Sequence, residues 1–211
     1  MFPALSALDF IRHGFTLRVP DLDVQTDRES ALQRLAQSHA AAVRESIGAE
    51  FRLITAEQVH GAEVEIVEEG GASFYPAADG LITRLNNVCL GIYVADCCAV
   101  YIADPVQRAV ALLHSGKKGT ELGIATIAID AMRAAFGSKP ADLVVQLSPC
   151  IRPPLYETDF AAQILAQVRA AGVRHVFDCG SNTGADMERY YSYRVERGRT
   201  GRMLALIARA F

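Results

Sequence analysis

Residues 88–115, with the sequence VCLGIYVADCCAVYIADPVQRAVALLHS, decide the fold because they predict three consecutive strands. The strands are expected at 88–95, 99–103 and 108–113, where apolar and β-branched residues dominate, and Asp104-Pro105 marks a turn. The apolar run Ala109–Leu113 indicates a buried strand. The segment therefore predicts a buried β-sheet.

The flanking sequence adds helices and further short strands. Helical patterns cover 31–47, 120–136 and 159–171, the first preceded by Thr26 and Glu29 at capping-box spacing. A loop is expected over 116–119. Further strands are expected at 7–18, 51–59, 62–68, 81–84, 142–148, 173–177, 191–196 and 202–208. About three helices among these many short strands predict a mixed α/β layered sandwich.

Composition excludes several classes of protein. The 211 residues include 24 acidic and 21 basic side chains, a net charge of −3 that argues against nonspecific nucleic-acid binding. Apolar runs are too short to span a bilayer, and the N-terminal sequence lacks the basic segment of a signal peptide. Five Cys, an odd number, argue against a disulfide scaffold. We expect one domain over 1–211 in a cytoplasmic protein that binds neither nucleic acid nor membrane.

Three segments place a potential metal ligand at a strand end beside a turn: QVHG at 58–61, ADCC at 95–98 and HSG at 114–116. Two His and one Cys suit zinc, with a fourth position left for water or substrate. Side chains alternate along a strand, so at most one of Cys97 and Cys98 faces a metal. Asp96 is a weak acid–base candidate because alternation can point it away.

Each of these residues also has a simpler interpretation. His60 would serve as a polar turn residue, the cysteines as small core residues, and His114 as a core histidine with a satisfied hydrogen bond. His39 is expected on the solvated face of the first helix. In SGKKGT at 115–120, Lys117 and Lys118 stand where a strand passes into a helix, which favours anions, but they also suit a solvated turn.

Together the motifs resemble the laccase-domain family, also called the multicopper polyphenol oxidase or YfiH-like family. The resemblance rests on RHGFTLR at 12–18, EQVHGAEV at 57–64, DGLIT at 79–83, VADC at 94–97, HSGKKGTELGI at 114–124, SPCIRPPLYE at 148–157, YYSYR at 190–194 and TGR at 200–202. It spans essentially the whole chain in the family's order.

The resemblance implies a single-domain four-layer α/β/β/α sandwich, like the catalytic domain of a cytotoxic necrotising factor. It implies one metal ion per chain, usually zinc, held by His60, Cys97 and His114, and it selects Cys97 over Cys98. These three residues would also carry the catalysis. Copper is the alternative metal, because the family's older name implies it.

The resemblance also implies an activity on purine nucleosides. Family members phosphorolyse adenosine, inosine and methylthioadenosine, some deaminate adenosine, and a bacterial branch resembles a peptidoglycan-precursor editing hydrolase. Purine nucleoside and phosphate are therefore the expected partners. The candidate anchors for phosphate are Lys117, Lys118, Arg18 and Arg194.

The sequence departs from the family pattern in three places. HSGKKG replaces HAGWRG, so Lys118 stands where the family has an arginine, and lysine lacks the planar fork that suits phosphate. The family's SLNLG segment is absent, and RPPLYE replaces a GPCCYE-like segment. These differences bear on substrate and efficiency more than on metal or fold.

Three other functions compete with the phosphorylase and deaminase interpretation. A polyphenol oxidase needs several copper ions, and five His are few for such a cluster. A hydrolase would use Cys97 as the nucleophile with His60 or His114 as the base. A divergent, non-catalytic chain would bind purines without turnover.

Overall fold

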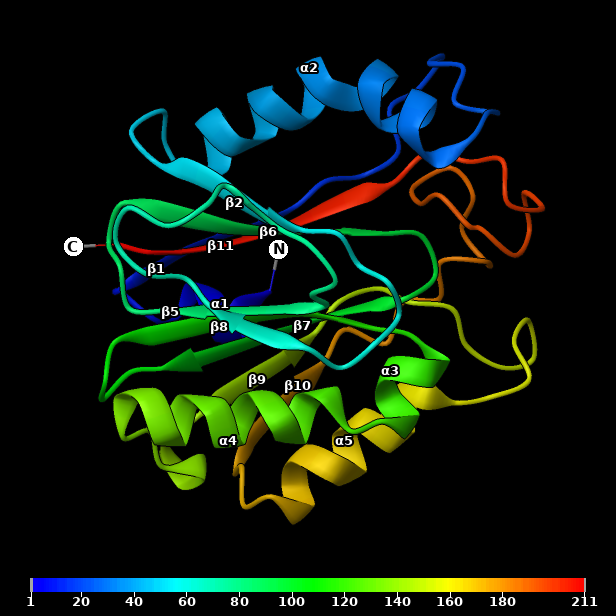
Figure 1. Cartoon of the computed structure of the whole chain (residues 1–211). Coiled ribbons are helices and arrows are strands. Elements are labelled where there is room, and N and C mark those ends of the chain that lie inside the picture. The colour runs from blue at the N-terminus through cyan, green and yellow to red at the C-terminus, as the bar shows by residue number, and fades with distance from the viewer. Residues whose placement is uncertain (1, 211) are drawn as a thin grey trace.

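The structure, a computed structural model, describes residues 2–210 and contains two β-sheets packed face to face (Figure 1). The first sheet has five strands, in the order β1 (Ile11–Phe15), β11 (Met203–Arg209), β6 (Val88–Val94), β2 (Arg52–Ala56) and β4 (Phe74–Tyr75). The second has six, in the order β10 (His175–Asp178), β9 (Val144–Leu147), β7 (Cys98–Asp104), β8 (Ala109–Ser115), β5 (Gly80–Thr83) and β3 (Val64–Ile66). Both sheets mix parallel and antiparallel pairs.

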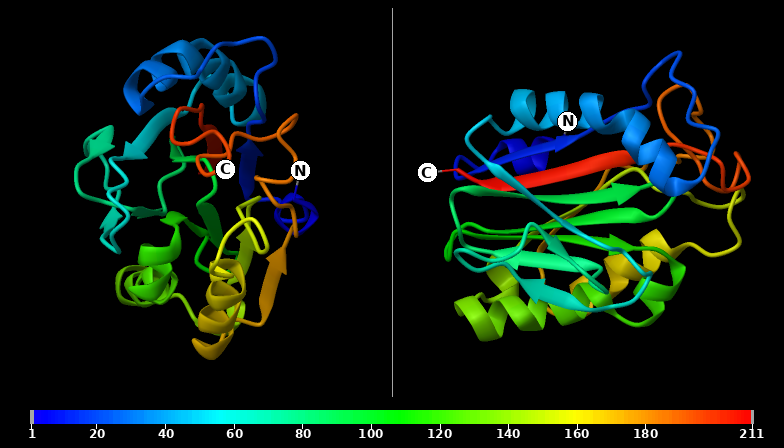
Figure 2. Two further views of the ribbon diagram at one scale, coloured as in Figure 1. Left: turned by 90° about the vertical axis from the view of Figure 1, so that its right-hand side faces the viewer. Right: turned by 45° about the horizontal axis from the view of Figure 1, so that its top comes forward.

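Helices cover the outer faces of the two sheets. The helical segments are α1 (Pro3–Ser6), α2 (Arg28–Ser46), α3 (Lys117–Glu121), α4 (Ile124–Phe136), a 3-10 turn (Pro140–Asp142) and α5 (Phe160–Ala170). Figure 1 shows α2 over the five-stranded sheet and α4 with α5 over the six-stranded sheet, and Figure 2 shows the same order from two other directions. The mixed α/β class is confirmed, and the order of the layers is consistent with the α/β/β/α sandwich that the resemblance implies.

Three apolar clusters fill the spaces between these layers, and strand β7 shows how the sequence divides between them. Ala99, Tyr101 and Ala103 point into the core between the sheets, whereas Val100 and Ile102 point into the core beneath α4 and α5. This alternation follows from the two-residue period of a strand. A third cluster joins α2 to the five-stranded sheet. The predicted central strands are therefore buried on both faces.

Helix α2, predicted at 31–47, differs from its prediction at two residues. Asp27, not Thr26, is its N-cap, because the Asp27 side chain accepts a hydrogen bond from the backbone N–H of Ser30. His39 is buried rather than solvated, and its ring lies 3.1 Å from the carbonyl oxygen of Arg202. His39 therefore packs between helix α2 and the rest of the protein.

Four other expectations are corrected. The strand predicted at 7–18 is shorter than expected, because residues 7–10 and 16–18 form no strand and β1 runs from Ile11 to Phe15. Residues 117–119 of the loop predicted at 116–119 are helical, in α3, and the helix predicted at 120–136 is interrupted: residues 120 and 121 belong to α3, and α4 begins at Ile124. The break falls at Gly123, whose φ of +79° is left-handed. Residues 191–196 form turns rather than a strand.

Within residues 2–210, no helix combines the length and the apolar composition needed to cross a membrane.

Candidate functional site

Strand register brings two of the three candidate ligands together. β7 and β8 pair in antiparallel fashion with Ala99 opposite His114 and Cys98 opposite Ser115. Cys97 comes immediately before β7, so it lies beside the end of β8 where His114 stands. The apolar runs that build the core thus also determine the spacing of these two ligands.

The third ligand lies on the turn that connects β2 of the first sheet to β3 of the second. Gln58 and His60 both adopt positive φ, at 65° and 62°, a conformation that needs support from its surroundings in residues other than glycine. The Gln58 side chain provides part of it: its amide donates to the carbonyl of Tyr93 on β6, and its oxygen accepts from the Tyr93 N–H at 2.9 Å. The turn is therefore fixed to the first sheet.

His60, Cys97 and His114 form one compact group, whose ligand atoms all lie within 4.8 Å of one another. The two imidazole rings are nearly perpendicular, with centroids 4.8 Å apart. His114 is buried and His60 is exposed, so the group is open to solvent on the His60 side. Gly116 makes room for the thiol, since a Cβ there would lie 2.6 Å from Cys97 Sγ.

The electrostatics of the group favour a thiolate. Burial raises the pKa of Cys97, but the charge and hydrogen bonds of His114 and His60 more than offset this and bring the pKa to about 6. Burial lowers the pKa of His114, while the Cys97 thiolate and Asp79 raise it to about 9. Near neutral pH, the thiol proton of Cys97 therefore passes to the imidazole of His114.

The donor set fits a metal ion. One thiolate and two imidazoles are ligands that zinc prefers, and three protein ligands with a free fourth position are typical of catalytic zinc sites. Metal binding would displace the proton of His114, because a coordinating imidazole is neutral. The same three side chains without metal would form a thiolate–imidazolium pair.

Asp79 lies directly behind the group and is completely buried. It precedes β5, whose Gly80 pairs with Leu113 of β8. Its carboxylate lies 2.8 Å from Nδ1 of His114 and accepts the backbone N–H groups of Val59, His60 and Gly61 at 3.1, 2.9 and 2.7 Å.

The group opens onto a cavity of about 850 Å³. Its cationic lining residues are Arg28, Lys117, Lys118, Arg194, Arg197 and Arg202. Its aromatic lining residues are Tyr93, Tyr156, Phe160 and Tyr193. Such a wall suits a ligand that has both an anionic group and a flat apolar ring.

Three of the four predicted phosphate anchors line this cavity: Lys117, Lys118 and Arg194. Glu157 pairs with Arg194 at 2.7 Å and lies 3.8 Å from Lys117. Among the ion pairs of residues 2–210, none involves Lys118.

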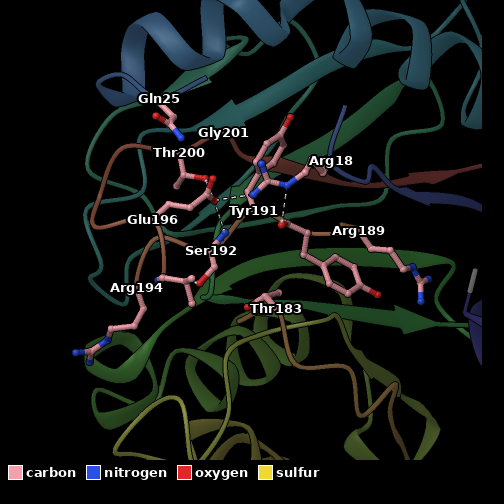
Figure 3. Close-up of polar contacts among 12 residues, drawn as sticks. Arg18, Gln25, Thr183, Arg189, Tyr191, Ser192, Arg194, Glu196, Thr200 and Gly201 are labelled. Carbon is pink, nitrogen blue, oxygen red and sulfur yellow. Dashed lines mark hydrogen bonds and ion pairs between the residues drawn. The ribbon is translucent and has the colours of Figure 1, made fainter. Parts of the chain in front are cut away.

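Arg18 does not lie among the lining residues of the cavity. Its guanidinium bonds Glu196 at 2.7 Å and stacks over the Tyr191 ring at 4.4 Å. Figure 3 shows Glu196 directed toward Arg18, Ser192 and Thr200, all of which it bonds. Arg18 therefore holds the 190–200 segment in place rather than facing the cavity.

Asp96 has a similar structural role. Its carboxylate accepts hydrogen bonds from the Thr183 hydroxyl at 2.7 Å, the Ser192 hydroxyl at 3.1 Å and the Arg194 N–H at 2.7 Å. With both oxygens occupied, it is poorly suited to move protons. Asp96 instead connects the segment that carries Cys97 to the segment that carries Arg194 into the cavity wall.

The sequence model of one protein family, described as multi-copper polyphenol oxidoreductase laccase, matches residues 21–161 and 156–210. The chain belongs to this family. The predicted resemblance to the laccase-domain family is thus confirmed.

Relatives within the laccase-domain family carry the name purine nucleoside phosphorylase. YlmD of Geobacillus stearothermophilus is 29% identical over 198 residues, covering 75% of this chain and 72% of the relative. SCO2081 of Streptomyces coelicolor is 33% identical over 123 residues, covering 57% and 50%. Human LACC1 is 40% identical over 75 residues, covering 36% and 17%. The chain thus matches half or less of the last two.

Solved structures agree with the fold of the laccase-domain family. The crystal structure of YlmD from Geobacillus stearothermophilus has a TM-score of 0.83 at 26% identity, covering 97% of this chain and 93% of that one. YfiH of Bacillus licheniformis has a TM-score of 0.82 at 24% identity, covering 94% and 92%. The second likeness concerns the fold alone.

Sequence reasoning missed Gln58 and Asp79 as parts of the site. Both stand inside motifs that it singled out, QVHG at 58–61 and DGLIT at 79–83. Their contacts depend on a left-handed turn and on strand register. Arg28, Arg197 and Arg202 were also missed as cavity residues: the first two are single arginines in ordinary polar stretches, and Arg202 stands in the quoted TGR motif but was given no role.

Proposed function

We propose that this chain is a metal-dependent purine nucleoside phosphorylase, with one zinc ion held by His60, Cys97 and His114. The proposal is supported by the names of the relatives and by the donor set. The observation that carries it is the cavity beside that donor set, where cationic and aromatic side chains share one wall. Adenosine, inosine and methylthioadenosine are the candidate nucleosides.

The lining residues divide between the two substrates. Lys118 would bind phosphate through its ammonium group, and Lys117 and Arg194, which both pair with Glu157, would add positive charge. Tyr156 and Tyr193 would stack on the purine. Arg194 already lies 4.7 Å over the Tyr156 ring, which links the anion-binding and aromatic parts of the wall.

Phosphorolysis needs both substrates in one orientation. A phosphate oxygen forms a bond to C1′ of the ribose as the bond from C1′ to N9 breaks, and the electron pair of that bond passes to the purine, which then takes up a proton. The cationic side chains would hold phosphate against the ribose and keep its charge neutralised. Zinc, when bound, would supply a Lewis acid that polarises a group of the substrate or lowers the pKa of a water.

The deciding experiment incubates metal-loaded protein with adenosine and phosphate, with and without a chelator, and separates the products. Adenine and ribose 1-phosphate, lost on chelation, are the expected products. Inosine formed without phosphate would instead indicate adenosine deamination, which is the second activity that a metal-activated water at this site would support. Absence of both products would contradict the proposal.

We expect no appreciable laccase turnover, despite the family's name. Among residues 2–210, one group of His, Cys, Asp and Glu side chains is arranged to hold a metal ion, whereas a multicopper oxidase needs several copper ions. Oxygen consumption with a phenolic dye, in protein loaded with stoichiometric copper, measures this. Robust uptake that His60→Ala abolishes would contradict the expectation.

A second candidate, a Cys–His hydrolase, is favoured by the thiolate–imidazolium pair, and alkylation separates it from a metal site. In zinc-loaded protein, iodoacetamide should spare Cys97, because a coordinated thiolate is blocked. After chelation at pH 7, Cys97 should react quickly, since its pKa is about 6. Peptide mass spectrometry reports each cysteine.

Exposed Cys179 provides the internal control for this alkylation experiment. Its modification should be the same with and without metal. Equal, rapid modification of Cys97 in both samples would favour the free nucleophile over the metal ligand.

A further inference from the structure

The carboxylate of Asp79 contacts both histidines of the candidate metal site by different routes. Oδ1 accepts the N–H of His60 at 2.9 Å and lies 2.8 Å from Nδ1 of His114. Oδ2 accepts the N–H groups of Val59 and Gly61 at 3.1 and 2.7 Å. It therefore contacts one ligand through its ring and the other through its backbone.

These contacts determine which nitrogen of His114 is free. Both Asp79 oxygens already accept backbone N–H groups, so each acts as an acceptor toward its neighbours. The ring nitrogen facing Oδ1 must then be the donor, so the hydrogen on Nδ1 stays in place and Nε2 is the nitrogen that gives up its proton to a metal. The ring is fixed in the tautomer that coordinates through Nε2.

The same carboxylate stabilises the turn that carries His60. Three consecutive N–H groups converge on it, and two residues of this turn, Gln58 and His60, have positive φ. Three converging N–H groups form an anion-binding concavity of the backbone, and a buried charge within it compensates the cost of the unusual conformation. Without this side chain, the turn would lose the acceptor of all three groups.

We infer that Asp79 is a positioning residue that orients both histidines of the metal site, fixing His114 for coordination through Nε2 and holding the turn that presents His60. The inference rests on the proposed function only in taking the triad as a metal site. Asp79 touches neither the substrate nor the metal in this role.

The test compares Asp79→Asn with a matched control, Asp104→Asn. Asp104 is also completely buried, and its Oδ1 accepts the N–H groups of Val106 and Gln107 at 2.8 and 2.9 Å, but it ends β7 at the opposite end from Cys97. Both substitutions replace a buried carboxylate that caps a turn. Only the first changes the partner of the metal ligands.

Zinc affinity is measured by competition with a chromophoric chelator, together with the visible spectrum of the cobalt-loaded protein. Asp79→Asn should weaken zinc binding about 10- to 100-fold, the usual effect of removing an outer partner of a metal ligand, and should alter the cobalt spectrum. Asp104→Asn should bind zinc like the wild type. Equal affinities in wild type and Asp79→Asn would overturn the inference alone, whereas a wild type that takes up no zinc would overturn the proposed function as well.

Should Asp79→Asn fail to fold, nitrogen NMR of the zinc-loaded wild type decides. A hydrogen on Nδ1 of His114 with Nε2 bound to zinc supports the inference. Coordination through Nδ1 overturns it.

Discussion

Replacement of Cys97 by alanine should empty the metal site, whereas replacement of Cys98 should leave it loaded. Cys97 supplies the one thiolate of the triad and faces His60 and His114. Cys98 points the other way, into the core beneath α4 and α5. We expect zinc affinity to fall by more than about 100-fold in Cys97→Ala, because loss of a ligand should exceed the 10- to 100-fold effect of losing an outer partner.

Elemental analysis of the two purified variants, with a chelator competition for the affinity, measures this difference. Cys98→Ala is the matched control, since it removes the same side chain one residue away. It should lose some stability, because it leaves a small cavity in a packed core. A Cys98→Ala protein without metal, beside a loaded Cys97→Ala protein, would reverse the assignment of the ligand.

Lys118→Ala should raise the half-saturating phosphate concentration in phosphorolysis about 10- to 100-fold. A hydrogen bond to a charged group contributes about 1.5–3 kcal/mol, which corresponds to this range. Lys118 lines the cavity and is not engaged with Glu157, which pairs with Lys117 and Arg194. Its ammonium group is therefore available to an incoming anion.

Lys117→Ala is the matched control for Lys118→Ala, because Glu157 already offsets part of its charge. It should have the smaller effect on phosphate dependence, and Lys118→Arg should preserve or improve phosphate use by restoring a bidentate donor. Zinc content should be unchanged in all three variants. An unaltered phosphate dependence in Lys118→Ala would shift the phosphate site to Arg194.

The parts of the fold that depend on local pattern were predictable. The runs that form β6, β7 and β8 are apolar enough to be strands in any context, and they carry Cys97 and His114 at their ends. Helix α3 was not predictable, because KKGTE has no apolar period. It is stabilised by a contact that the sequence does not show, between the buried hydroxyl groups of Ser115 and Thr120 at 2.8 Å.

Contacts between distant residues account for the rest. Arg18 was expected to bind phosphate because it is a cation in a family motif, but its partner Glu196 lies 178 residues further along the chain. Asp79 stood in a recognised motif, yet its approach to His114 follows only from the pairing of β5 with β8. A residue's type and spacing indicate its chemistry, whereas tertiary pairing decides which neighbour it serves.

The triad also joins the two halves of the sandwich. His60 and Cys97 lie on two of the three segments, after β2 and after β6, that cross from the five-stranded sheet to the six-stranded one, and His114 lies on β8 of the latter. A bound ion would therefore cross-link both connections to a central strand, much as a disulfide would. An ion that binds only the folded chain stabilises it by about 4 kcal/mol at a free concentration of 1,000 Kd. The metal would therefore also stabilise the folded chain against separation of the two sheets.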